Sequence, residues 1–160
     1  MSYQTIAIAG FIYMLSMPAY IVYILTKSKK IGYAATGILA AGAGIHTFGF
    51  IQRFKEMYEI NQSFLRSIPV TNLYESLVFF VLCLVTGYLI VEWKYRKKSL
   101  GVLVAIIAGI TTSLTELLGI SKEVQPLVPA LKSNWLLAHV TLSFIAYAAF
   151  GISFITALLH

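Results

Sequence analysis

Three histidines stand out as residues that could do chemistry: His46, His139 and His160. His46 and His139 lie inside long apolar stretches, where ionisable side chains are costly and each invites a functional hypothesis. At 1.5 Å per residue, His46 in AGAGIHTFGFIQRF lies roughly 10 to 12 Å before the end of its stretch, and His139 in SNWLLAHVTLSF lies about one turn into its own. We therefore expect the two imidazoles on one side of the protein, at depths that differ by ~5 Å. His160 is expected at the opposite side, with no role.

A neutral imidazole is a common metal ligand, and haem iron is one of its targets. Such a ligand donates its other ring N–H to a carbonyl or carboxylate, which fixes the tautomer. The alternative for either histidine is a hydrogen bond to a neighbouring helix without any ligand. Two histidines at similar depth favour ligation, but the residues alone leave both interpretations open.

A second polar group lies in RSIPVTNLYESLVFF, where Asn72 and Glu75 precede an apolar stretch. Thr71 could cap a helix starting here, and an acidic residue is favoured in the first turn by the helix dipole. This local role is sufficient for both residues. The alternative is that Asn72 and Glu75 bind a ligand, or support a histidine, at the outer surface.

Other kinds of catalytic site find no support in the sequence. Cys83 is the only cysteine, so an internal disulfide or a thiol-based zinc site is excluded. The patterns GxSxG, HExxH, GxxxxGK[ST] and GxGxxG are absent. The sequence therefore offers no motif for a hydrolase, a zinc protease or a nucleotide-dependent enzyme.

The elements that carry these residues are predicted from composition. Of 160 residues, 59% are hydrophobic and 11% charged, whereas soluble domains carry about 25% charged residues. Each apolar stretch can cross a hydrocarbon core of about 30 Å as a helix, and the alternation expected of a transmembrane barrel is absent. We predict an all-α, polytopic transmembrane bundle of about five spanning helices, forming a single domain over residues 1–160. The stretches cover approximately 4–26, 31–52, 73–93, 100–120 and 135–159.

The net charge of +6 is distributed in a way that predicts orientation. Basic residues cluster in the gaps between apolar stretches, which favours helix-end signals over nucleic-acid binding. The first and third gaps are short and dense in lysine and arginine, so they are predicted to be cytoplasmic, with the N-terminus outside. These residues are Lys27, Lys29, Lys30, Lys94, Arg96, Lys97 and Lys98.

Three segments together resemble a known family: HTFGFIQRF, IPVTNLYESLVFF and PLVPALKSNWLLAHVTLSFIAYAAFGISF. They are similar to the N-terminal part of the membrane cytochrome c biogenesis proteins of the CcsA/ResC type, the haem-handling subunit of the System II cytochrome c synthase. The third segment is the most specific, since its order of Ser-Asn-Trp, His-Val and Tyr-Ala-Ala-Phe is not dictated by hydrophobicity.

The resemblance implies a role for His139 as an axial ligand to haem b at the outer face. Trp135, one helical turn earlier, could flank the haem edge. His46 matches a histidine of the family's second helix, without an implied ligand role. The family's tryptophan-rich WWD segment and its later histidines are absent, since the only tryptophans are Trp93 and Trp135. We therefore expect the chain to be the N-terminal part of a longer protein, and not active alone.

The implied reaction joins haem vinyl groups to the cysteine thiols of a CxxCH motif in an apocytochrome c, at the outer face of the bacterial plasma membrane. The implied membrane partner is of the CcsB/ResB type. Two alternatives remain: a small b-type haem protein in which His46 and His139 bind one iron, and a non-catalytic membrane scaffold.

Overall fold

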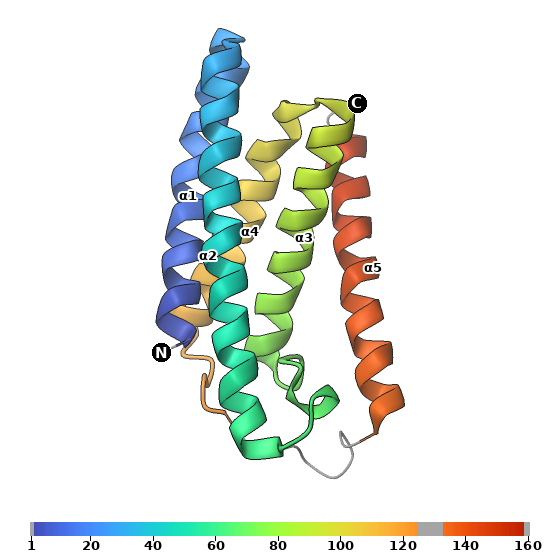
Figure 1. The fold of residues 1–160 in the computed structure, drawn as a ribbon. Coiled ribbons are helices and arrows are strands. Elements are labelled where there is room, and N and C mark those ends of the chain that lie inside the picture. The colour runs from blue at the N-terminus through green and yellow to red at the C-terminus, as the bar shows by residue number, and fades with distance from the viewer. Residues whose placement is uncertain (1, 125–132, 159–160) are drawn as a thin grey trace.

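The computed structural model describes residues 2–124 and 133–158, without the side chains of residues 116 and 136. All regular secondary structure in these residues is helical (Figure 1). Five helices are long and apolar enough to cross a membrane, the fourth span including the short 3-10 helix η2 (Lys98–Leu100). The predicted all-α integral membrane bundle is confirmed; His160 lies outside the described residues. The helices are α1 (Ser2–Thr26), α2 (Lys29–Asn61), α3 (Leu73–Tyr95), α4 (Gly101–Leu117) and α5 (Asn134–Leu158).

The connections divide the bundle into two ends. Residues 27–28 join α1 to α2, and residues 96–100 join α3 to α4 at the same end, which we call the basic end. At the opposite end, residues 62–72 join α2 to α3 through the 3-10 helix η1 (Leu65–Ser67). The starts of α1 and α5 also lie at this second end, which we call the Arg53 end (Figure 1).

Helices α1 to α4 form the packed part of the bundle. α1 lies against α2 and α4, and α3 lies against α4 (Figure 1). Tyr13 and Tyr20 of α1 and Tyr88 of α3 are fully buried in the core between them. Small residues allow this close approach: a Cβ atom on Gly42 of α2 would lie 2.8 Å from the ring of Tyr13.

Helix α5 is packed much more lightly than the others. It contacts α3 mainly, where Ala148 and Ile155 are buried. Only 11% of its spanning window is buried, against 28% to 44% for the other four spans. Most of its apolar surface is therefore open, on the outside of the bundle (Figure 1).

Two helix boundaries differ from those predicted. α2 ends at Asn61 instead of near residue 52, because Arg53 and Met57 are buried against the bundle and extend the helix beyond its apolar stretch. α4 ends at Leu117 instead of near residue 120. Gly119 follows it with φ of +60°, a left-handed conformation that glycine adopts without steric cost.

Candidate functional site

His139 and Trp135 lie together near the start of α5, at the Arg53 end. Trp135 is 86% exposed and His139 is exposed as well. The carbonyl of His139 accepts a hydrogen bond from the Ser143 hydroxyl at 2.8 Å, as expected within a helix. The imidazole itself makes no hydrogen bond or ion pair with any residue that the structure describes. Within the described part of the chain, both ring nitrogens of His139 are therefore without a partner.

His46 is in the opposite situation, fully buried between α1 and α3. Its Nδ1 shares a hydrogen bond with the Tyr13 hydroxyl at 3.0 Å, and the two rings are tilted at 47°. Its Nε2 is buried and has no hydrogen-bond partner among the described residues. His46 thus has the contacts of a histidine that joins packed helices.

A ladder of aromatic rings gives the relative depth of the two histidines. Phe50 of α2 stacks on Phe79 of α3 with ring centroids 5.5 Å apart, and Phe79 meets Phe144 of α5 edge-on at 6.3 Å. His46 lies four residues from Phe50 toward the basic end, whereas His139 lies five residues from Phe144 toward the Arg53 end. His139 therefore lies nearer the Arg53 end than His46 does.

The ~5 Å difference in depth expected from the sequence stays a prediction. When two imidazoles bind one iron, the iron lies between them, so both rings must point to the same position. A buried His46 and an exposed His139 at different depths do not meet that requirement in this arrangement.

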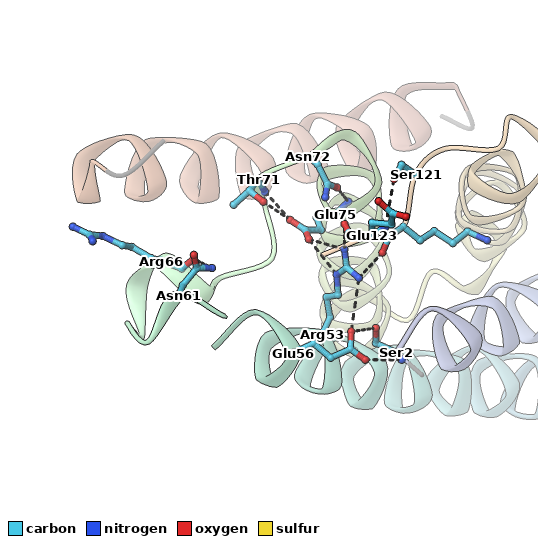
Figure 2. A network of polar contacts seen from close by, with 11 residues as sticks. Ser2, Arg53, Glu56, Asn61, Arg66, Thr71, Asn72, Glu75, Ser121 and Glu123 are labelled. Atoms are coloured by element: carbon cyan, nitrogen blue, oxygen red, sulfur yellow. Dashed lines mark hydrogen bonds and ion pairs between the residues drawn. The ribbon is translucent and has the colours of Figure 1, made fainter. Parts of the chain in front are cut away.

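The predicted polar residues of α3 belong to a buried ion pair, shown in Figure 2. Arg53 of α2 donates from Nε and Nη2 to Oε1 of Glu75, at 3.1 and 2.9 Å. Both side chains are at most 3% exposed. A guanidinium that bonds a carboxylate with two donors holds it in a fixed orientation, so the pair locks α2 to the start of α3.

The other polar atoms of this cluster are also occupied. Oε2 of Glu75 accepts from the Thr71 amide at 3.0 Å and from its hydroxyl at 2.7 Å. The Asn72 side chain accepts from the Glu75 amide at 2.9 Å and caps α3. The predicted helix start is confirmed, but the cap is Asn72, while the Thr71 hydroxyl bonds the carboxylate. This cluster is therefore built to fix the helix, and the idea that Asn72 and Glu75 bind a ligand remains a prediction.

Arg53 also ties down the segment after α4. It donates to the carbonyls of Lys122 and Glu123 at 2.7 and 3.2 Å (Figure 2). Glu56, 3.7 Å from Arg53, accepts hydrogen bonds from Ser2 at the start of α1. One arginine thus joins α1, α2, α3 and the residues that follow α4.

A second buried cluster, at the basic end, was not predicted from the sequence. Glu92 of α3 accepts from Lys98 and from Thr36 of α2, both at 2.5 Å. Its other oxygen accepts from the hydroxyls of Tyr88 at 2.7 Å and Tyr20 at 3.0 Å. Glu92 therefore joins α1, α2 and α3 at the basic end, opposite the end that Arg53 holds together.

Comparison with known proteins identifies the family. A family model described as "Cytochrome C assembly protein" matches residues 70–160, more than half of the chain. "Cytochrome c biogenesis protein CcsA" of Picosynechococcus sp. is 47% identical over 85 residues, covering 51% of this chain and 25% of that protein. The proteins of the same name from Trieres chinensis and Chlorella vulgaris are 43% and 42% identical over 82 and 84 residues. These cover 49% and 51% of this chain, and 26% of each relative.

The chain thus matches about a quarter of the length of these curated relatives. No solved structure matches it. The matched region of the family contains α3, α4 and α5, and so includes Trp135 and His139. Five membrane-spanning helices and this match together show that the chain belongs to the cytochrome c assembly protein family.

Proposed function

We propose that this chain is the N-terminal, haem-presenting part of a cytochrome c synthase of the CcsA/ResC type. His139 would hold haem iron from one side at the outer face, and Trp135 would flank the haem edge. One observation carries the proposal: both side chains are exposed one turn apart on α5, the helix least covered by the rest of the chain. Both also lie within the matched family region.

The residues present suit haem as a substrate. An imidazole with no partner among the described residues can ligate iron, and an exposed indole offers an apolar face to a porphyrin edge. In the attachment reaction, each apocytochrome thiol adds across a haem vinyl group. A C–S bond forms, the thiol proton goes to the neighbouring carbon, and no electron is gained or lost. The chain's part is to bind and orient the haem, since the bond-forming chemistry is the cofactor's own.

The proposal needs contributions from outside residues 1–160. A second axial ligand and the tryptophan-rich surface would come from protein that this sequence does not contain, and a CcsB/ResB-type subunit would be the membrane partner. Only 11% of the spanning window of α5 is buried, and its open face is where such protein would complete the bundle. An apocytochrome c with a CxxCH motif would be the acceptor.

The proposed orientation places the Arg53 end outside. The basic end carries the short, cation-rich connections that favour the cytoplasm, and the N-terminus then lies outside with the start of α5. This puts His139 at the face where cytochrome c would be assembled, in the plasma membrane of a bacterium.

The test is a haem titration of the purified chain in detergent, followed by its absorption spectrum in the oxidised and reduced forms. We expect a Soret band in the wild type that is lost in His139→Ala and restored by added imidazole, which occupies the vacated position. His46→Ala is the matched control, since it removes an imidazole that lies buried. We expect it to keep the Soret band, with circular dichroism confirming that the variant is folded.

Two results would contradict the proposal. Loss of the Soret band in both variants, with both folded, would favour the b-type haem protein in which His46 and His139 share an iron. Absence of a Soret band in the wild type would mean that these residues do not hold haem unaided, which would favour a scaffold.

A further inference from the structure

A cavity of about 390 Å³ lies at the basic end, on the opposite side of the bundle from the start of α5. It is formed where α1, α2 and the α3–α4 connection meet, and it is lined by Tyr23, Lys29, Tyr33, Arg96 and Lys98. Three of these five side chains are cationic, they come from different parts of the chain, and no carboxylate lines the cavity. The lining thus concentrates positive charge in one place, as anion sites do.

The three cations are not equivalent. The Lys98 ammonium is already paired, since it bonds Glu92 and lies 4.5 Å from the centre of the Tyr33 ring. Lys29 and Arg96 are exposed and make no ion pair with any residue that the structure describes. They supply two uncompensated charges beside the cavity, and Lys98 is held rigidly behind them.

Arg96 follows α3 in the left-handed conformation that Lys27 and Gln62 also adopt after α1 and α2. Arg96 ends α3 with φ of 59°, and its amide bonds the Glu92 carbonyl at 2.8 Å. Glycine usually occupies such a left-handed position, because a side chain there is strained. A cation at a helix C-terminus is favoured by the dipole. The dipole does not explain why Lys29 of α2 and Arg96 of α3 converge on one cavity.

The chemistry of the lining indicates the ligand. Arginine forms paired hydrogen bonds with phosphate oxygens, and lysine adds a point charge. The cavity lies where the spanning helices end. Basic pockets between spanning helices are sites at which anionic lipid headgroups bind. We propose that this cavity binds the phosphate of an anionic phospholipid headgroup.

The test compares two double variants that each lose two positive charges at the same end. Lys29→Gln with Arg96→Gly removes both free cations of the cavity, and glycine suits the backbone at residue 96. Lys30→Gln with Lys94→Gln is the matched control, because both lysines are exposed and neither lines the cavity. Native mass spectrometry of the purified chain measures binding of dioleoylphosphatidylglycerol and of dioleoylphosphatidylcholine, with circular dichroism as the check on folding.

We expect the wild type to prefer phosphatidylglycerol, and the cavity variant to bind it about thirtyfold more weakly, as two lost contacts near the membrane surface predict. The control variant should stay within about twofold of the wild type, and phosphatidylcholine binding should not change. Equal losses in the two double variants would overturn the proposal in favour of diffuse charge attraction. Unchanged binding in the cavity variant would overturn it as well. Displacement of the lipid by an equal concentration of inorganic phosphate would show that the ligand is a free anion, and would overturn the lipid as occupant.

Discussion

The packed helices α1 to α4 bury polar side chains that bond one another, whereas the open helix α5 exposes polar side chains near its start. In the packed part, Arg53 bonds Glu75, and His46 bonds Tyr13, all inside the protein. On α5, His139 and Trp135 face outward. Buried ionisable groups in a membrane protein are costly unless paired, so the paired ones are explained by the fold. The Nε2 of His46 is buried without a partner among the described residues, whereas the exposed His139 is the imidazole for which we propose a ligand role.

The largest effect on stability is expected from the buried ion pair between Arg53 and Glu75. We expect Glu75→Ala to lower the free energy of unfolding by about 3 to 5 kcal/mol, because it leaves the Arg53 guanidinium buried without its carboxylate. Reversible SDS titration in mixed micelles measures this. Glu59→Ala removes an exposed carboxylate from the same end of the bundle and should change stability by less than about 0.5 kcal/mol. Similar values for the two variants would show that the Arg53 cluster does not stabilise the bundle.

The cluster at the basic end should give a smaller but coupled effect. Glu92→Gln keeps the shape of the side chain but removes the charge that Lys98 bonds, and we expect a loss of about 2 to 3 kcal/mol. A double-mutant cycle with Lys98→Met isolates their interaction. Since the two atoms are in direct contact, the cycle should show a coupling energy above about 1 kcal/mol. Additive losses would mean that Glu92 acts through Thr36, Tyr20 and Tyr88 and not through Lys98.

The sequence predicted the number of helices correctly, because each apolar stretch is long enough to satisfy its own backbone in a bilayer. It also predicted the helix start at Asn72 and Glu75, a local signal carried within a few residues. It did not predict the partners of these residues. Glu75 bonds Arg53, 22 positions earlier, and only the packing of α2 on α3 brings them together.

Arg53 and Glu92 were missed because each lies beside polar residues at the end of an apolar stretch, where a charge is normally solvated. A signal for Arg53 was present. Ala43, His46, Gly49, Arg53 and Met57 recur at helical spacing, and all five are buried along one face of α2.

Two glycines of α2 test which face of this helix is packed and which is open. Gly42 lies against Tyr13, so Gly42→Ala should cost about 1 to 3 kcal/mol through overpacking. Gly37 has nothing within 4 Å of an added Cβ, so Gly37→Ala should be neutral or stabilising by up to about 1 kcal/mol through helix propensity. Thermal unfolding of both variants in one detergent tests this. A cost at Gly37 equal to that at Gly42 would place another molecule against the face of α2 that is open in this chain.

The smallest effect on stability is expected where the effect on function is largest. Trp135 and His139 are exposed, so Trp135→Ala and His139→Ala should each change the free energy of unfolding by less than about 0.5 kcal/mol. His46→Ala should cost more than either, because it leaves a cavity and removes the partner of the buried Tyr13 hydroxyl. The SDS titration and the haem titration, applied to the same three variants, should therefore rank them in opposite orders. A histidine that matters to haem but not to folding is a ligand, whereas equal rankings would mean that His139 supports the bundle in a way that its exposed position does not explain.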